Sequence, residues 1–226
     1  MRQKDPSIII IGAGGIVQHA HLPAYKKAGY TVRGLFDTDI DKAKKVAAEF
    51  SIPAVYNSLE QAIAAAGPAD IFDLAVPASA ILPVLHQLPP GAAVLLQKPM
   101  GENLEQAKEI LARCKQKKLL AGINFQLRYA PFILKAKELL NSGQIGTLCD
   151  IEININVLTP WQLWDFLFSL PRMEILYHSI HYVDLVRQLA GEPESVFART
   201  IKHPDMPQLA SVKSMIYLDY GENMRA

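Results

Sequence analysis

Lys98 has the sequence neighbours expected of a lysine that takes part in a reaction. It lies between Gln97 and Pro99, directly after the apolar stretch 93–96, which has the composition of a short buried strand. A half-buried ammonium at a strand end can donate a hydrogen bond to a substrate hydroxyl and stabilise the negative charge that develops on its oxygen. The alternative is an ordinary solvated lysine. We favour the functional interpretation because ligands of parallel sheets bind beyond the carboxyl ends of the strands.

A second group of reactive side chains lies between residues 175 and 184. Tyr177, His178, His181 and Asp184 have spacings that place them on one face of a helix. A neutral imidazole such as that of His181 can accept the proton that leaves a hydroxyl group during its oxidation. A metal site made of both histidines and Asp184 is an alternative, but packing or a single general acid is the preferred interpretation, and no metal is expected.

A glycine-rich turn follows the first apolar run of the chain, residues 7–11, which resembles a strand buried on both faces. Gly12 would make the turn, and Gly14 would let a pyrophosphate approach the N-terminus of a helix beginning near Gly15. Val17 stands where the usual dinucleotide motif has its third glycine. The turn residues assigned to cofactor binding are Gly12, Gly14, Gly15 and Ile16.

Asp37 indicates which dinucleotide would bind. It follows the second apolar run, 30–36, and lies 25 residues after Gly12. An acid at this place accepts hydrogen bonds from ribose hydroxyls and repels a 2′-phosphate, and neither Thr38 nor Asp39 supplies a compensating cation. The sequence therefore predicts NAD(H) in preference to NADP(H).

The elements that must position these residues alternate between short apolar runs and amphipathic helical stretches as far as residue 123. This alternation is typical of an α/β fold, here a Rossmann-type doubly wound parallel sheet. Val76 and Pro77 follow one of the strands and should border the nicotinamide. Helix starts are indicated by the pairs Thr38 and Asp41, Ser58 and Gln61, and Asn103 and Gln106. The six expected strands are 7–11, 30–36, 54–56, 71–74, 93–96 and 120–123.

The pattern changes after residue 123, where strands follow one another without helices between them. This predicts an α+β domain with an open antiparallel sheet in residues 124–226. The last expected strand, 211–219, has an unprotected edge, so pairing with another chain into a homodimer or larger oligomer is expected. The expected elements are helices at 131–142 and 175–190 and strands at 148–157, 195–201 and 211–219.

Aromatic residues are concentrated before the second of these helices. Trp161, Trp164, Phe166 and Phe168 either form a lid over the core or build walls that exclude water and stack on nicotinamide or a sugar. Arg172, at the end of this loop, could orient a polar substrate or pair with Glu174. Elsewhere, His19 and His21 do not share a helix face, and we interpret them as structural or adjacent to the cofactor.

Composition excludes several classes of protein. The 226 residues are half hydrophobic and carry a net charge of +1, with acidic and basic residues interleaved, so neither a nucleic-acid partner nor a membrane surface is indicated. No apolar run is long enough to span a membrane, and the polar N-terminus leaves no room for a signal peptide. Cys114 and Cys149 lack metal-ligand spacing and suit a reducing cytoplasm.

Five segments in order carry a resemblance to a known family. They begin at residues 12, 21, 75, 97 and 122 and read GAGGI, HLPA, AVP, QKPM and GINFQLRYAP. This set resembles the Gfo/Idh/MocA oxidoreductases, the family of glucose–fructose oxidoreductase and inositol dehydrogenase. The resemblance implies a Rossmann domain in residues 1–123, and a second domain in 124–226 whose sheet borders the substrate and often forms the subunit interface. It also implies that this second domain is incomplete here, because relatives usually continue for roughly another hundred residues.

The resemblance also assigns roles to particular residues. The family's Glu-Lys-Pro motif falls on Gln97, Lys98 and Pro99, so the functional lysine is kept while the first residue is changed. The family's catalytic histidine falls on His181, and Tyr177 occupies the position of its aspartate. The residues assigned to substrate contact are Asn124, Arg128, Trp161, Trp164, Arg172 and His178.

The sequence thus predicts an NAD(H)-dependent oxidoreductase that interconverts an alcohol and a ketone on a sugar, cyclitol or related polyol. Lys98, His181 and Tyr177 are its expected catalytic residues. The alternative is a catalytically inactive dinucleotide-binding protein that acts as a sensor or partner subunit, which the changes at positions 97 and 177 keep open. A purely structural α/β protein is a third alternative, but it would give no reason for Asp37 and Lys98 to stand at strand ends.

Overall fold

The computed structural model describes residues 6–163 and 165–226. The chain divides into two compact units, Met1–Asn124 and Phe125–Ala226, and each is described by itself.

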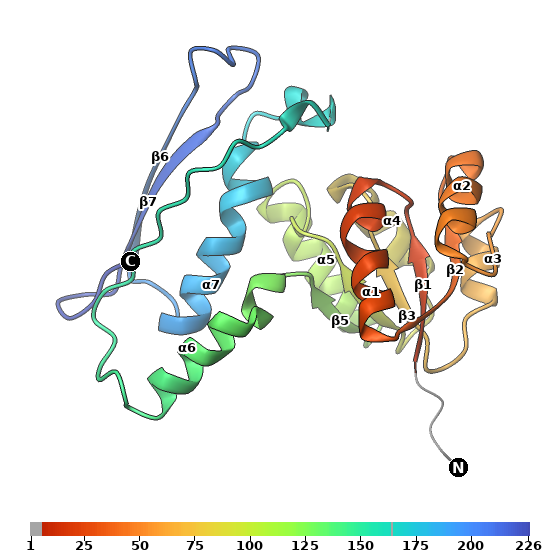
Figure 1. Ribbon diagram of the computed structural model, residues 1–226, viewed down its shortest axis with the longest axis horizontal. Coiled ribbons are helices and arrows are strands. Elements are labelled where there is room, and N and C mark those ends of the chain that lie inside the picture. Colours follow the sequence, from red (N-terminus) through yellow and green to blue (C-terminus); the bar gives the residue numbers. More distant parts are fainter. Residues whose placement is uncertain (1–5, 164) are drawn as a thin grey trace. The chain divides into compact units, whose positions relative to one another are not determined.

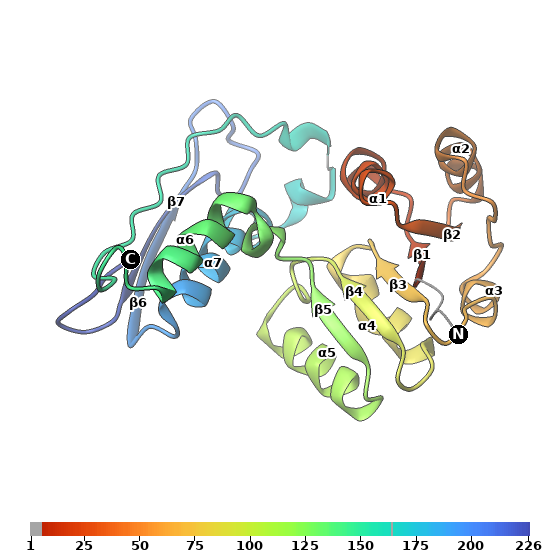
Figure 2. The same ribbon diagram turned by 60° about the horizontal axis from the view of Figure 1, so that its bottom comes forward.

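The first unit is built on a five-stranded parallel sheet with the strand order β2-β1-β3-β4-β5 (Figures 1 and 2). The chain steps from β1 to β2 on one side and to β3 on the other, so the strand order reverses at β1, where ligands bind in open α/β sheets. The expected Rossmann-type sheet is confirmed. The strands are β1 (Ser7–Ile11), β2 (Thr31–Phe36), β3 (Ile71–Leu74), β4 (Ala93–Leu96) and β5 (Leu120–Ile123).

Apolar side chains cover both faces of this sheet. Ile9 and Ile11 belong to one buried cluster, whereas Ile8 and Ile10 belong to another, because successive side chains of a strand point to opposite faces. The continuous Ile run therefore reflects a strand packed on both sides. The covering helices are α1 (Leu22–Ala28), α2 (Ile40–Phe50), α3 (Leu59–Ala64), α4 (Ala78–Gln87) and α5 (Leu104–Gln116).

Two of the three predicted helix starts have the expected caps. The side chains of Ser58 and Asn103 accept hydrogen bonds from the backbone N–H groups three residues later. In α2 the prediction was wrong by one residue, since Asp39 rather than Thr38 caps the helix by accepting from Lys42 N at 3.0 Å.

The strand expected at 54–56 does not form. Val55 makes an isolated bridge with Leu35, flanked by hydrogen bonds from Leu35 N to Ala54 O and from Tyr56 N to Leu35 O. Pro53, which has no N–H to donate, directly precedes the pairing residues. The pairing therefore ends after one residue, and the sheet has five strands rather than six.

The second unit combines short helices with a two-stranded antiparallel sheet. β6 (Ser195–Ile201) and β7 (Lys213–Asp219) pair along their whole lengths, from Ser195 opposite Asp219 to Ile201 opposite Lys213. β7 begins two residues later than expected. The helical elements are the 3₁₀ turns η2 (Gln126–Tyr129), η3 (Trp161–Leu163) and η4 (Asp165–Ser169), the π turn η5 (Ile175–Ser179), and the helices α6 (Pro131–Asn141) and α7 (Ile180–Ala190).

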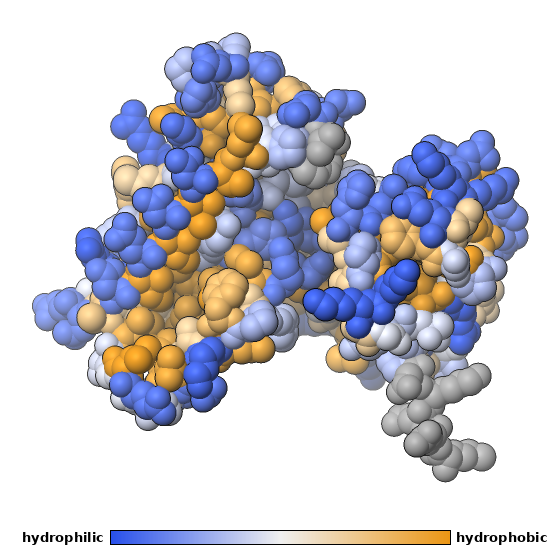
Figure 3. All heavy atoms as spheres, viewed as in Figure 1, coloured by the Kyte–Doolittle hydropathy of each residue, from blue (hydrophilic) through white to orange (hydrophobic). Residues whose placement is uncertain are grey.

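The strand expected at 148–157 is an extended segment without a ladder. Hydrogen bonds join it to Arg225 only at its start, from Ile151 N to Arg225 O and from Arg225 N to Cys149 O. A strand needs a partner along its length, and alternating apolar side chains alone do not supply one. Among the described residues, apolar side chains of this unit remain on the surface, and orange atoms gather in a band over it in Figure 3.

None of the described helices combines the length and apolar character that crossing a bilayer would require.

Candidate active site

The glycine turn at the end of β1 has the geometry that close backbone approach requires. Gly12 has φ +107°, and a Cβ there would overlap the carbonyl oxygen of Ala75, so only glycine fits. A Cβ on Gly14, in contrast, would meet nothing within 4 Å. Gly14 therefore leaves open space in front of the backbone, as a cradle for a pyrophosphate requires, and the helix that begins at Gly15 presents its N-terminus there.

Asp37 lies beside this turn, as expected for a residue that contacts ribose. Its Oδ2 accepts a hydrogen bond from Ala13 N at 2.6 Å, and its Oδ1 accepts from Asp39 N at 2.9 Å. Thr38 and Asp39 supply no cation, but Lys42 does, since its Nζ lies 3.0 Å from Asp37 Oδ2. Lys42 lies in the first turn of α2, five residues after Asp37, and the helix start brings its side chain back to the carboxylate.

Lys98 follows β4 at the same edge of the sheet. The strand ends level in register, with Leu74, Leu96 and Ile123 paired across β3, β4 and β5, so residues 97 and 124 emerge side by side. Burial lowers the pKa of Lys98 to about 8. An amine with this pKa releases its proton near neutral pH far more readily than a fully solvated lysine does.

A buried hydrogen-bond network includes Gln97, the residue before Lys98, and was not predicted from the sequence. His21 Nδ1 is 2.6 Å from Asp73 Oδ2, and Tyr25 donates to the same oxygen at 2.9 Å. His21 Nε2 lies 3.0 Å from Gln97 Nε2 and 3.3 Å from Asn124 Nδ2. The available signal was Asp73 itself, the one charged residue in the otherwise apolar strand Ile71–Leu74. Asn124, assigned to substrate contact, is thus bound to a histidine.

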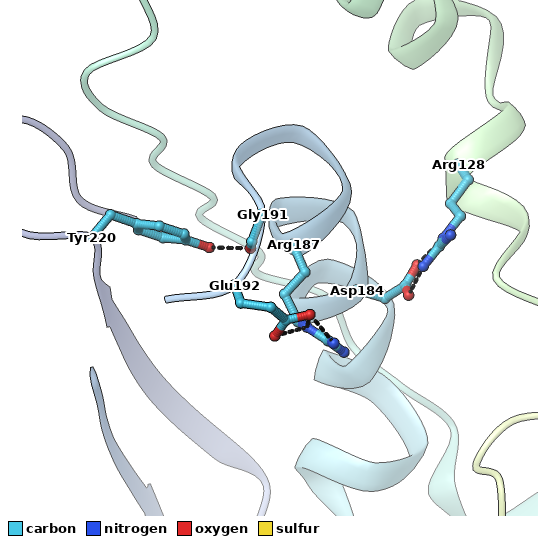
Figure 4. Close-up of polar contacts among 6 residues, drawn as sticks. All are labelled: Arg128, Asp184, Arg187, Gly191, Glu192 and Tyr220. Atoms are coloured by element: carbon cyan, nitrogen blue, oxygen red, sulfur yellow. Dashed lines mark hydrogen bonds and ion pairs between the residues drawn. The ribbon is translucent and has the colours of Figure 1, made fainter. Parts of the chain in front are cut away.

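In the second unit, Arg128 and Asp184 form an ion pair that joins η2 to α7 (Figure 4). Arg128 donates to Asp184 through Nε at 2.6 Å and through a second nitrogen. Hydrogen bonding to Asp184 raises the pKa of Arg128, although burial opposes the shift. Arg128 was expected to contact substrate, and in this structure its guanidinium is held by a carboxylate.

Tyr177 and His181 each contact an aromatic ring. His181 lies edge to face with Phe125, with 6.2 Å between ring centroids, and Tyr177 with Phe166 at 5.5 Å. Tyr177 belongs to the π turn η5 and His181 to the first turn of α7. Such single π turns within helices are frequent at functional sites.

His178 does not share the surroundings of Asp184, although spacing placed them on one face. His178 Nδ1 lies 3.3 Å from Glu174 Oε1, and both residues line a cavity of about 350 Å³ within the second unit. Asp184 instead pairs with Arg128. The π turn changes the residues per turn, so straight helical spacing fails here. Among residues 6–163 and 165–226, no three His, Cys, Asp or Glu side chains are grouped to hold a metal ion.

Glu174 is buried and well bonded. Burial raises the pKa of Glu174, but hydrogen bonds from His178, Ser214 and Ser179 outweigh it, so the net shift is downward. Arg172 is exposed, and Glu174 is committed to these three donors.

The aromatic residues before this helix have different surroundings. Trp161 is buried with Leu167, Met173 and Leu209 and contacts the ring of His178. Its position supports the core-lid alternative. Trp164 lies outside the described residues.

The glycine turn, the acid after β2 and the parallel sheet with its reversal at β1 define a dinucleotide-binding Rossmann domain. Family models go further. Residues 7–125 match the model described as the oxidoreductase family with an NAD-binding Rossmann fold, and residues 133–224 match that of the GFO/IDH/MocA C-terminal domain. The chain belongs to the Gfo/Idh/MocA oxidoreductase family, which confirms the resemblance.

Individual relatives agree with this assignment. YceM of Salmonella typhimurium, an oxidoreductase by provisional name, is 32% identical over 183 residues, which cover 80% of this chain and 55% of YceM. The chain therefore spans little more than half of that relative. A protein of Haloferax volcanii named D-xylose 1-dehydrogenase (NADP(+)) 2 is 23% identical over 219 residues, covering 96% of this chain and 67% of that protein.

A solved structure shows the same fold. An oxidoreductase of Agrobacterium radiobacter, crystallised with NAD⁺, L-tartaric acid and magnesium, superimposes with a TM-score of 0.81. The two chains are 22% identical, and the match covers 98% of this chain and 65% of that one.

Proposed function

We propose that this protein is an NAD(H)-dependent oxidoreductase that interconverts an alcohol and a ketone on a sugar, cyclitol or related polyol in the cytoplasm. The observation that carries the proposal is the half-buried Lys98, whose pKa is lowered to about 8 by burial, at the end of β4 and at the same edge of the parallel sheet as the glycine turn. Family membership supports the class of reaction. The xylose dehydrogenase name of one relative supports a sugar-like substrate.

The residues of the first unit fit a dinucleotide. The open space at Gly14 would receive the pyrophosphate, and the Asp37 carboxylate would accept hydrogen bonds from the adenosine ribose. Val76 and Pro77, at the end of β3, would border the nicotinamide. The bound cofactor would supply the hydride acceptor or donor.

Two side chains would serve the reacting oxygen of the substrate. Lys98 would donate a hydrogen bond to that oxygen and stabilise its partial negative charge. His181 would accept the hydroxyl proton when the alcohol is oxidised and return it in the reverse direction. Tyr177 would act as a neutral hydrogen-bonding neighbour rather than as the acid found in relatives.

The test is a screen of polyols and sugars for a rise in NADH absorbance with NAD⁺ present. We expect turnover that is lost in Lys98→Met and retained in Lys108→Met, which changes an exposed lysine. Tight NADH binding without turnover on any polyol would favour the second candidate, a dinucleotide-dependent sensor or partner subunit. That candidate is favoured by Gln97 and Tyr177, where the family motifs have carboxylates.

A further inference from the structure

Asp73 is a carboxylate in the middle of an apolar strand. Its side chain is 0% exposed, and the residues around it in β3 are Phe72 and Leu74. One oxygen, Oδ2, receives hydrogen bonds from His21 and Tyr25, whereas Oδ1 has no hydrogen-bond partner among the described residues. A buried charge is costly unless it is well bonded, so this strand position would be more stable with an apolar residue.

The contacts of His21 fix which ring nitrogen carries a proton. A carboxylate only accepts hydrogen bonds, so Nδ1, at 2.6 Å from Asp73 Oδ2, must donate. Nε2 faces the amide nitrogens of Gln97 and Asn124, which only donate, so Nε2 must accept. The arrangement therefore requires the neutral imidazole with its proton on Nδ1.

His21 reaches this place because the helix is wound differently there. Residues Val17–His21 form a π turn before α1, and such turns insert an extra residue that redirects side chains. His21 is 6% exposed, while His19 on the same turn is exposed. The backbone thus turns one of two neighbouring histidines onto the sheet.

We infer that His21 is a positioning residue, held by Asp73 and Tyr25, which fixes the side chains of Gln97 and Asn124 and through Gln97 holds Lys98 at the sheet edge. Gln97 and Asn124 are the first residues after β4 and β5, so the two amides bound by one imidazole tie these strand ends together. Lys98 follows Gln97 directly, and a Gln97 side chain fixed at 9% exposure leaves its backbone little freedom. The inference rests on the proposed function only for the role of Lys98 in the reaction.

A merely structural network would give a different result from a positioning one. If the network only filled space, its loss would lower the stability of the first unit and leave the surroundings of Lys98 unchanged. If it positions Lys98, its loss lets the ammonium move toward water. Because desolvation is what lowers the pKa of Lys98, the pKa should then rise toward the ordinary lysine value.

The first experiment measures the tautomer of His21 in the cofactor-free full chain by long-range ¹H–¹⁵N NMR. We expect a protonated Nδ1 and an unprotonated Nε2 at neutral pH. In Gln97→Glu, a carboxylate replaces the donating amide, so Nε2 should become protonated. A proton on Nε2 of the unaltered protein would overturn the inference, because the two amides would then be turned the other way round.

The second experiment measures the pKa of Lys98 from the pH dependence of its acetylation by acetic anhydride, read by mass spectrometry. The unaltered protein should give a midpoint near pH 8. In His21→Ala and in Asp73→Asn the midpoint should rise by about 1–2 units as Lys98 becomes solvated. His21→Gln keeps one hydrogen-bond donor and one acceptor, so its acetylation midpoint should stay close to that of the unaltered protein.

The matched control is His19→Gln, an exposed histidine two residues away, which should leave the midpoint unchanged. An unchanged midpoint in folded His21→Ala or in folded Asp73→Asn would overturn the inference. Should His21→Ala not fold, Asp73→Asn decides the outcome together with the tautomer. Neither experiment involves substrate or cofactor, so a protein without dehydrogenase activity would refute the proposed function and leave this inference standing.

Discussion

At the level of single residues, we expect the carboxylate of Asp37 and the ammonium of Lys42 to set the preference between NADH and NADPH. Asp37 is fixed by Ala13 N, while Lys42 lies 3.0 Å from it and could approach a 2′-phosphate. We expect NADH to bind more tightly than NADPH because Asp37 would face that phosphate directly. Asp37→Ala should narrow the difference in affinity between NADH and NADPH, and Lys42→Ala should widen it.

Fluorescence titration with both cofactors measures these affinities. Lys44→Ala is the control, because Lys44 is exposed and its partner Asp41 is also exposed. Tighter binding of NADPH than of NADH by the unaltered protein would contradict the prediction.

His181 is the second residue with a testable role. If the protein is a dehydrogenase, His181→Ala should lower turnover by roughly 10²–10⁴-fold while NADH binding stays nearly unchanged. Tyr177→Phe should cost much less, because a phenol with a pKa of about 10 is neutral at pH 7 and can only hydrogen-bond. Steady-state rates and NADH titrations measure the two effects.

His86→Ala, which removes an exposed imidazole of the first unit, should leave turnover unchanged. Full turnover in His181→Ala would show that Lys98 or another group accepts the proton.

Lys98 also links stability to pH. Burial lowers the pKa of Lys98 from the ordinary 10.5 to about 8. Between these two pH values the unfolded chain binds more protons than the folded one, so the free energy of unfolding rises with pH. Below about pH 8 both states carry the charge, and the folded state bears the whole cost of burying it.

Lys98→Met should therefore raise the free energy of unfolding at pH 7 by about 1–3 kcal/mol, and the gain should shrink as pH approaches 10.5. Urea unfolding at several pH values measures this gain, with Lys108→Met as the exposed control. A gain that does not depend on pH would show that Lys98 is solvated.

Among the contacts between elements, the ion pair between Arg128 in η2 and Asp184 in α7 gives a testable prediction. Asp184 is buried, so Arg128→Ala would leave a carboxylate unpaired and should lower the free energy of unfolding by about 1–3 kcal/mol. Arg187 pairs with Glu192 at the end of the same helix, α7, but Glu192 is exposed (Figure 4). Arg187→Ala should therefore cost only about 0.5 kcal/mol.

Urea unfolding followed by circular dichroism measures both variants. If Arg128→Ala and Arg187→Ala lower the free energy of unfolding equally, Asp184 is solvated or finds another donor once Arg128 is removed.

At the scale of the whole molecule, the two-stranded sheet predicts self-association. Phe197 and Tyr217 are opposite each other on β6 and β7, and both side chains are exposed. Neighbouring exposed apolar residues on an open sheet favour pairing with a second copy. Phe197→Glu, at a position that is 57% exposed, should therefore weaken association about tenfold or more.

Sedimentation equilibrium gives the dimer dissociation constant. Leu104→Glu, at a position of the first unit that is 62% exposed, should leave it unchanged. A monodisperse monomer at high concentration would refute the prediction.

The parallel sheet, the glycine turn and the position of Lys98 after a strand follow from the sequence alone. These features depend on local rules: an apolar run buried on both faces, a turn that only Gly12 can make, and polar caps three residues from their partners. Such patterns involve only a few neighbouring residues, so they can be recognised in the sequence. The same local rules predicted strands at 54–56 and 148–157, where pairing is limited to single bridges at Val55 and Asp150.

Which polar groups meet depends on the tertiary structure. His21 and Asp73 are 52 positions apart, Arg128 and Asp184 are 56 apart, and Lys42 reaches Asp37 across a helix start. Nothing in local spacing fixes these pairs, because they depend on how strands and helices are brought together and on π turns that break regular helical periodicity. The sequence could name Lys98 as a candidate reactive residue, but the buried imidazole that contacts Gln97 and Asn124 is found only when the ends of β4 and β5 come level at one edge of the sheet.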